Sequence, residues 1–155
     1  MVVLLKETLS EPTLNFPYGA HAQLLLTAAR RGFRYPDRAA GVRFGCALGM
    51  ETHYPELFSA YEEQDVDCVL FSTHGNAESP GIFAVEAAGH AAANSLWVSY
   101  AGPAGGPPAG LVDPDGTWAA RCTADGAGLA VAEVSSSTGS PARVWRRTAR
   151  SSLRD

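Results

Sequence analysis

The sequence predicts an α/β domain in which helices cover a mixed β-sheet. Three observations support this fold class. Short apolar runs typical of strands alternate with helical patterns between Val42 and Tyr100. Short strand-like runs joined by turn residues follow between Leu111 and Val134. The order strand–helix–strand–helix–strand, then hairpins, is the pattern of a layered α/β fold.

The first predicted strand and the first predicted helix lie on either side of Gly49. Residues 42–48 have the pattern of a strand with small residues, which ends at Gly49. Pro55 opens the helix at a first-turn position, where its missing N–H leaves no bond unmade. The helix continues with apolar side chains at helical spacing, namely Leu57, Phe58 and Tyr61. We expect it to end at residues 65–67.

A second strand, helix and strand follow in the same way. Residues 68–71 are a continuous apolar run, the pattern of a strand covered on both faces. After a turn at residues 79–81, an alanine-rich helix is expected over residues 82–94 and a strand over residues 96–100. The small side chains of this helix allow it to pack closely against a sheet.

The last part of the domain is predicted to be all strand and turn. Leu111 and Val112 form a short strand, and residues 113–116 carry Pro and Gly where a tight turn needs them. Residues 117–122 and 129–134 are expected to complete a β-meander.

A change of composition at Ser135 marks the predicted edge of the domain. We therefore expect one domain over residues 1–134 and a basic, flexible, solvated tail over residues 135–155. The tail contains five arginines against one acid: Arg143, Arg146, Arg147, Arg150, Arg154 and Asp155. Because Trp145 is its only aromatic residue, we expect no binding to nucleic acid.

The bulk composition limits the other classes of partner and ligand. The chain has 155 residues and a net charge of −4, a size typical of one globular domain. Because no apolar run approaches the roughly 20 residues of a membrane-spanning helix, we expect no membrane partner. Residues 1–6 are too short an apolar run for a signal peptide, so we predict a cytoplasmic protein.

The cysteines and histidines suggest neither a disulfide framework nor a metal site. The cysteines are three in number and widely spaced, at Cys46, Cys68 and Cys122. The histidines lack the spacing of metal ligands. We expect no metal and no cofactor.

The segment from Gly41 to Asn76 carries the most specific pattern. In it, Gly49 and Glu51 precede a Tyr54-Pro55-Glu56 step. This arrangement resembles the nitrilase superfamily of carbon–nitrogen hydrolases, in which a strand rises to an elbow with the nucleophilic cysteine. The family pattern continues as Cys-x-Asp/Glu-x-x-Phe-Pro-Glu, so the resemblance puts Glu51 on the acidic position and Gly49 on the nucleophile.

Three later segments resemble the same family in the same order. Residues 90–94 are similar to its Arg-Ala-x-Glu-Asn helix end, retaining Ala91 and Asn94. Residues 109–116 are similar to Ser-x-apolar-apolar-Asp-Pro-Asp-Gly, with alanine in place of the serine. Residues 129–134 match the closing strand. The resemblance implies the C-terminal part of a four-layer αββα sandwich.

The resemblance also implies a chemistry and the side chains that it needs. The family uses a Glu, Lys and Cys triad to form a covalent acyl-enzyme from nonpeptide C–N substrates such as small amides and nitriles. Gly49 offers no nucleophile. Lys6, the only lysine, matches the family's Lys-x-x-Leu and is the candidate for stabilising the oxyanion. The family's Glu falls before the start of this chain.

Several neighbouring side chains are expected to have structural roles. Cys46 lies three residues before Gly49, and we expect it to pack inside its strand rather than act as a nucleophile. Glu51 and Glu56 are expected to accept backbone N–H bonds near the start of the following helix. His53, where the family often has arginine, is expected to be solvated.

The sequence leaves four functions open. The chain could be a hydrolase homologue without turnover, or an interaction module that pairs with itself or with an intact paralogue. It could also be an active amide hydrolase, with an unusual nucleophile or as a fragment that lacks an upstream segment, or an unrelated α/β domain. Without the N-terminal half of the fold, strand edges and apolar surface would stay open, which favours a homo-oligomer.

Overall fold

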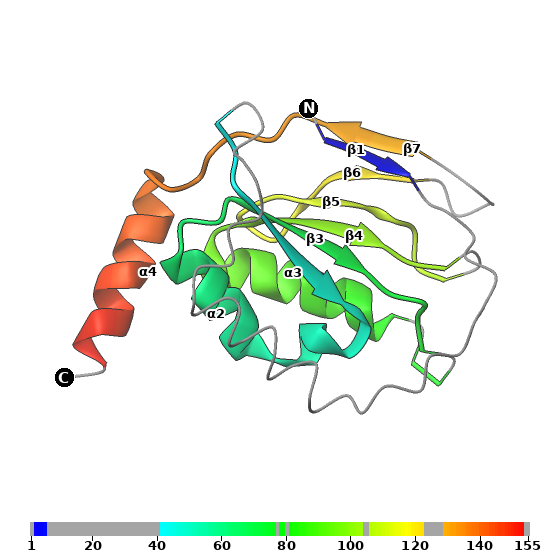
Figure 1. The fold of residues 1–155 in the computed structure, drawn as a ribbon, viewed down its shortest axis with the longest axis horizontal. Coiled ribbons are helices and arrows are strands. Elements are labelled where there is room, and N and C mark those ends of the chain that lie inside the picture. Colours follow the sequence, from blue (N-terminus) through cyan, green and yellow to red (C-terminus); the bar gives the residue numbers. More distant parts are fainter. Residues whose placement is uncertain are drawn as a thin grey trace.

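The computed structural model describes the backbone of residues 2–5 and residues 41–76, 78–79, 81–103, 106–122 and 129–153 in full (Figure 1). Its elements are β1 (Val2–Leu5), β2 (Phe44–Leu48), the 3-10 helix η1 (Gly49–His53), α2 (Pro55–Glu63), β3 (Cys68–Ser72), α3 (Ile82–Asn94), β4 (Trp97–Ala101), β5 (Gly110–Val112), β6 (Trp118–Arg121), β7 (Leu129–Ala132) and α4 (Pro141–Ser152).

The main sheet has five strands in the order β2-β3-β4-β5-β6. Its first three strands are parallel, with Cys68 of β3 opposite both Phe44 of β2 and Trp97 of β4. β5 and β6 continue the sheet antiparallel. Each parallel connection carries a helix, as parallel neighbours need a long crossover. The predicted mixed sheet with covering helices is therefore confirmed.

The helices α2 and α3 cover one face of this sheet (Figure 1). Phe58 of α2 and Ala87 of α3 are completely buried against strand side chains such as Phe71 and Val98. Burying one such large apolar side chain contributes about 1.5–3 kcal/mol to folding. The predicted bounds of the alanine-rich helix are confirmed, because α3 spans residues 82–94 and ends at Ser95 in the left-handed region, with φ of 50°.

The opposite face of the sheet packs against a second, two-stranded sheet formed by β1 and β7 (Figure 1). β7 runs antiparallel to β1, with Ala132 opposite Val2. Between the two sheets lie the buried side chains of Cys68, Leu111 and Val134. The described chain thus has three layers, in the order helices, sheet and sheet.

The predicted β-meander is wrong in one respect. Residues 118–121 and 129–132 are strands, but β7 pairs with β1 in the second sheet instead of extending the main sheet beyond β6. The alternating pattern identifies a strand and its buried side, and Ala130 is indeed buried. The pattern does not identify the partner, which is set by the need to cover the open face of the main sheet.

The turn between β5 and β6 forms as predicted. The Gly116 N–H donates to the carbonyl oxygen of Asp113 over 3.0 Å, and Gly116 has a φ of 85° that glycine adopts without strain. The Asp113 side chain accepts from the N–H groups of Asp115 and Thr117, both at 3.0 Å. These three bonds fix the direction in which β6 returns along β5.

The predicted solvated tail differs from the structure, since residues 141–152 form the helix α4. Ser140 caps the helix by accepting the N–H of Arg143, and Pro141 occupies its first turn. Arg143 is completely buried, with its Nε donating to Glu62 at 3.1 Å. The tail's composition indicated solvated arginines because the acid that pairs with them lies far away in the sequence. The domain boundary at residue 134 stays a prediction.

Glu62 of α2 is the centre of the contact between α4 and the body. Its carboxylate binds Arg143, Arg147 and Arg150, and its side chain is only 2% exposed. Arg147 also donates to Asp65 at 2.7 Å. A buried carboxylate requires such charged partners, because removing it from water is costly otherwise.

Candidate functional site

The predicted elbow residues, 49–56, lie at the carboxyl edge of the parallel strands. β2, β3 and β4 end side by side at this edge, since their registers align Leu48 with Ser72 and Ser72 with Ala101. The elbow at Gly49 follows β2 at once, and Gly102 follows β4. In open parallel sheets, ligands bind outside the carboxyl ends of the strands. This edge is therefore the candidate site.

Gly49 makes the sharp turn from β2 into η1. Its φ is 50°, in the left-handed region where glycine is favoured. A Cβ atom added at Gly49 would have no heavy atom within 4 Å. The elbow therefore leaves open space at the position that the resemblance gives to the nucleophile.

Glu51 holds this turn from inside. It is 5% exposed, and its Oε2 accepts the backbone N–H of Leu48 over 2.8 Å. The carbonyl of Glu51 accepts the N–H of Tyr54 at 3.1 Å. Tyr54 and Glu56 are exposed, whereas Pro55 begins α2. Of the two glutamates, Glu51 therefore stabilises the elbow, whereas Glu56 faces solvent.

His53 joins the elbow to α3. Its Nδ1 lies 2.6 Å from a carboxylate oxygen of Glu86, and its ring stacks against Phe83 at a centroid distance of 5.2 Å. The His53 side chain is 24% exposed. The sequence predicted a solvated side chain here, and the structure instead gives it a charged partner on the next helix.

His90 is a second link from α3, which the sequence did not single out as a site residue. Its Nε2–H donates to the carbonyl oxygen of Thr52 over 2.6 Å, and its ring stacks on Phe58 at 3.8 Å. Burial lowers the pKa of His90, although the Thr52 bond and the charge of Glu86 act in the opposite direction. The sequence offered one clue to this role, because His90 occupies the arginine position of the Arg-Ala-x-Glu-Asn resemblance.

Asn94 ties three helices together. It is 3% exposed, and its amide donates to the carbonyl oxygen of His90 at 3.0 Å. Its Oδ1 accepts from Arg150 of α4 at 2.6 Å and from Ser59 of α2 at 3.5 Å. These contacts give Asn94 a structural role at the end of α3, three residues before β4 begins, and not at the elbow.

Two buried hydroxyl groups lie close in sequence to the carboxyl edge without a partner in the described residues. They are Thr52 Oγ1 in η1 and Tyr100 Oη near the end of β4. Burial raises the pKa of Tyr100, which keeps its phenol protonated. A Cβ at Gly102 would lie 2.6 Å from Tyr100 Oη, so glycine is needed beside this phenol. Buried hydroxyls usually have a hydrogen-bond partner.

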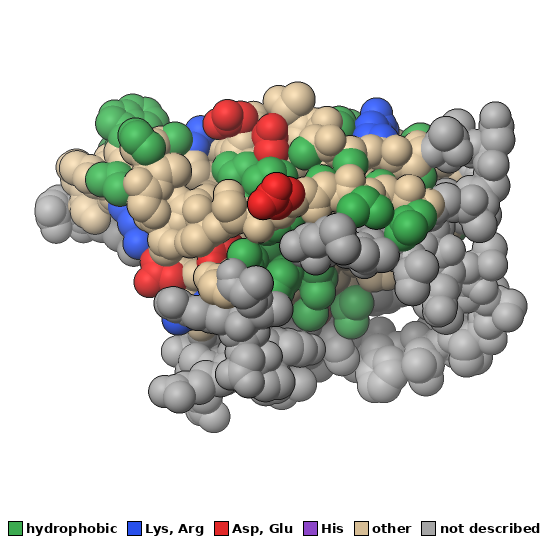
Figure 2. Space-filling model, turned by 90° about the horizontal axis from the view of Figure 1, so that it is seen from above, with side chains coloured by type: hydrophobic (Ala, Val, Ile, Leu, Met, Phe, Trp, Pro, Cys, Tyr) green, Lys and Arg blue, Asp and Glu red, His purple; other side chains and the backbone are tan. Residues whose placement is uncertain are grey.

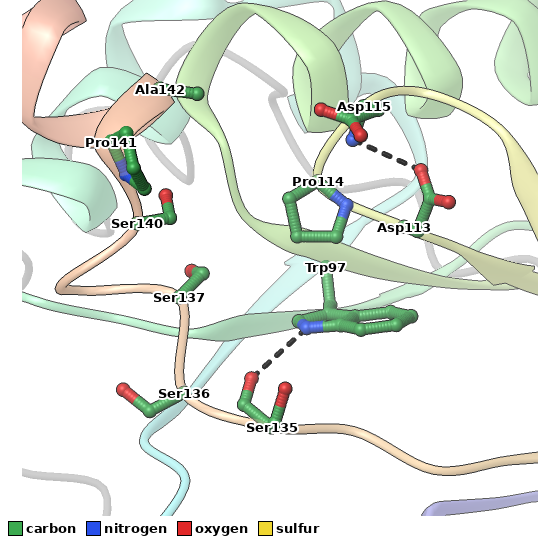
Figure 3. A pocket seen from close by; sticks show the side chains of 10 residues that line it. All are labelled: Trp97, Asp113, Pro114, Asp115, Ser135, Ser136, Ser137, Ser140, Pro141 and Ala142. Atoms are coloured by element: carbon green, nitrogen blue, oxygen red, sulfur yellow. Dashed lines mark hydrogen bonds between the residues drawn. The ribbon is translucent and has the colours of Figure 1, made fainter.

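An open hollow of about 560 Å³ lies at the other end of the parallel strands (Figure 3). Trp97, the first residue of β4, lies in it and donates from its indole to the carbonyl oxygen of Ser135 at 3.0 Å. The hollow is further lined by Asp113, Pro114, Asp115, residues 136 and 137, and residues 140–142. None of the predicted site residues lines it, so the candidate site is the elbow edge.

The three cysteine thiols lie in or beside strands and are buried or half-buried, and none is exposed at the elbow. Cys68 and Cys122 are buried, and burial raises the pKa of Cys68 to about 12. Cys46 is half-buried in β2. Lys6 lies outside the described residues. Within the described ranges there is no cluster of three or more metal-binding side chains, and no helix is long and apolar enough to cross a bilayer.

Comparison with solved structures identifies the fold. No family model and no curated protein matches the sequence. Nit3 of Saccharomyces cerevisiae, a nitrilase-superfamily member, matches 68% of this chain with a TM-score of 0.55 and 19% identity. The chain has a nitrilase-like fold.

Two further structures with this nitrilase-like fold match larger shares of the chain. The C. elegans NitFhit protein matches 73% of it, with a TM-score of 0.59 and 18% identity. A variant of the amidase from Nesterenkonia sp. AN1, in complex with butyramide, matches 76% with a TM-score of 0.56 and 20% identity. The chain spans less than half of each of these proteins, covering 41% of Nit3, 29% of NitFhit and 45% of the amidase.

Proposed function

We propose that this chain is a non-hydrolytic homologue of carbon–nitrogen hydrolases, which binds a small amide or nitrile without forming an acyl-enzyme. One observation carries the proposal. The backbone at Gly49 has the geometry of an elbow, with a positive φ and open space at its Cβ position, but glycine has no atom that can attack a carbon.

The surroundings of the elbow support the same proposal. Glu51 is engaged with the N–H of Leu48, so the nearest acidic side chain in sequence serves the turn. The nearest thiol in sequence, Cys46, is half-buried within β2. Glu51 is bound within the elbow and Cys46 lies within β2, so neither takes the place of the side chain that Gly49 lacks.

The ligand class rests on the fold relatives and on unpartnered polar groups. One variant of the Nesterenkonia amidase binds butyramide, and another shows addition of acrylamide at its active site cysteine. In this chain, the buried hydroxyls of Thr52 and Tyr100, in elements that adjoin the carboxyl edge, have no hydrogen-bond partner among the described residues. A neutral amide, which both donates and accepts hydrogen bonds, suits such hydroxyls.

The test uses butyramide and butyronitrile as probes. We expect saturable butyramide binding by ligand-observed NMR, no ammonia above the buffer level and no change in the intact mass. Cys46→Ser serves as the matched control, because any reaction at the remaining half-buried thiol would disappear in it. Ammonia release, or a covalent adduct on Cys46, would contradict the proposal and favour an active amide hydrolase.

A second candidate function is that of an interaction module that pairs with itself or with an intact paralogue. Exposed apolar side chains beside the elbow favour it, since Leu48, Met50 and Tyr54 are 55%, 40% and 37% exposed. Adjacent exposed apolar side chains are typical of surfaces that bind another protein. We refer to these three residues as the elbow surface.

Sedimentation velocity tests this second function. We expect an oligomer that dissociates at higher concentration in Leu48→Ser and Met50→Ser than in the wild type. The Leu48 change keeps the backbone N–H that Glu51 accepts, so the elbow itself should persist. A well-folded chain that stays monomeric at every concentration would exclude self-association, and then only pairing with a paralogue would remain.

A further inference from the structure

The two faces of α4 are reversed relative to an ordinary surface helix. The arginines Arg143, Arg147 and Arg150 face the body of the protein, where they bind Glu62. Val144 and Trp145 face outward and are 53% and 69% exposed. Figure 2 shows hydrophobic side chains exposed at the end of the molecule where α4 lies. A helix bordering water normally shows the opposite pattern.

The outward face of α4 forms one continuous stripe. Pro141, Val144, Trp145, Thr148 and Ser152 are all exposed and follow each other at three- and four-residue steps. Such steps put side chains on the same side of a helix. The stripe carries no charge and contains a tryptophan, a composition typical of the centre of a protein interface rather than of open surface.

The stripe is complementary in shape to the same stripe of a second copy that runs in the antiparallel direction. Its first half is bulky, at Val144 and Trp145, and its second half is small, at Thr148 and Ser152. Two identical helices side by side and antiparallel bring the bulky half of each against the small half of the other. A twofold interface has this reciprocal form, in which the same patch is used on both copies.

The hydrogen-bonding groups of the stripe match in the same arrangement. The hydroxyls of Thr148 and Ser152 each donate to the carbonyl four residues earlier, at 3.1 Å. Their oxygens therefore keep lone pairs that can accept from outside the helix. An indole N–H can only donate, so the Trp145 of one copy is a suitable donor to these oxygens on the other.

The geometry points to pairing of α4 with the α4 of a second copy of this chain, antiparallel, with Trp145 over Thr148 and Ser152 of that copy. Arg143, Arg147 and Arg150 do not oppose it, because they lie on the other face and bind Glu62. Antiparallel pairing also aligns the helix dipoles favourably. The inference rests on the second proposed function, association of copies, and assigns to it a surface separate from the elbow surface.

The test combines sedimentation with cross-linking of the full chain. We expect a dimer in the wild type, and we expect Trp145→Ala to raise its Kd by about 30-fold or more, as removal of an interface anchor does. Thr148 lies near the expected twofold axis, so Thr148→Cys should give a covalent dimer under a mild oxidant. Val85→Cys is the matched control, as it is 71% exposed on α3 and should not cross-link.

The outcomes separate this inference from the functions proposed above. A dimer that Trp145→Ala leaves unchanged, but that Leu48→Ser weakens, overturns the α4 pairing and keeps the interaction module. Equal cross-linking at Thr148→Cys and Val85→Cys also overturns it, and so does a monomer at all concentrations. Circular dichroism should show each variant folded, because Trp145 does not contribute to the Glu62 contacts. Butyramide binding at the elbow should be the same in Trp145→Ala, Thr148→Cys and Val85→Cys as in the wild type.

Discussion

The imidazole of His90 donates to the carbonyl oxygen of Thr52 over 2.6 Å and so ties α3 to the turn that follows Gly49. With the His53–Glu86 pair, it adds two contacts from α3 to the Glu51–Leu48 bond that holds the elbow at the end of β2. None of these contacts involves a side chain at position 49, so the elbow can keep its shape without a nucleophile.

The first prediction concerns pH. Burial lowers the pKa of His90 below its unfolded value of 6.5, so the folded protein binds fewer protons there than the unfolded chain as the pH falls through this range. Its contribution to stability is complete above pH 6.5 and decreases below it, by at most about 1.4 kcal/mol per pH unit. Urea unfolding should show this decrease in the wild type and a smaller one in His90→Gln. An identical pH dependence in both would contradict the assignment.

The second prediction concerns the contact between α4 and the body. Arg143→Met leaves the buried carboxylate of Glu62 without one of its partners, so we expect a loss of about 3–5 kcal/mol in the free energy of unfolding. Arg147→Met removes a guanidinium that is 37% exposed and should cost less than about 1 kcal/mol. Denaturant unfolding of both variants measures the difference, and equal losses would argue against a buried role for Arg143.

The third prediction compares two glycines. A Cβ at Gly110 would lie 2.3 Å from the carbonyl oxygen of Ala120 on the neighbouring strand, so Gly110→Ala should destabilise the protein by about 1–3 kcal/mol. Gly89 lies on α3 with open space at its Cβ position, and Gly89→Ala should stabilise the protein by about 0.5–1 kcal/mol. Thermal unfolding shows whether each substitution raises or lowers the stability. A Gly110→Ala variant as stable as the wild type would refute the close approach of β5 and β6.

The fourth prediction concerns the open position at the elbow. In Gly49→Cys the new thiol should react with iodoacetamide faster than Cys46, because its Cβ has no neighbour within 4 Å. The left-handed backbone should cost about 1–2 kcal/mol in stability. Peptide mass spectrometry measures the two labelling rates. We expect no butyramide turnover, since the side chain alone does not supply a base.

The fifth prediction concerns Cys68. Burial raises the pKa of its thiol to about 12, so at neutral pH it should stay unlabelled by iodoacetamide in the folded protein. Labelling should appear only in denaturant, together with unfolding measured by circular dichroism. Rapid labelling of Cys68 in the native protein would mean that the two sheets open locally.

The core of the fold could be predicted from local patterns. The helix over residues 82–94 was readable because a turn precedes it and small residues fill it, and the run at residues 68–71 marked a doubly covered strand. In both cases, the residues that predict the element lie within it or directly beside it. The pairing of β7 with β1 was not readable, because 124 or more residues separate the partners and local alternation does not select between them.

The candidate site was predicted less completely, for a related physical reason. Gly49 and the Tyr54-Pro55-Glu56 step are contiguous in sequence, so a motif could locate them. The partners that fix the elbow, Glu86 and His90, come from α3, and only folding brings them to His53 and Thr52. Likewise, Arg143 looks solvated in its own segment and becomes a buried residue through the distant Glu62.

The pairing of β1 with β7 has a consequence for synthesis of the chain. Val2 finds its partner only when Ala132 has been made, so β1 leaves the ribosome long before β7 exists. At ordinary translation rates this interval is on the order of ten seconds. During that time, a short apolar strand has free backbone groups at both edges, which is the state in which nascent chains bind chaperones or each other.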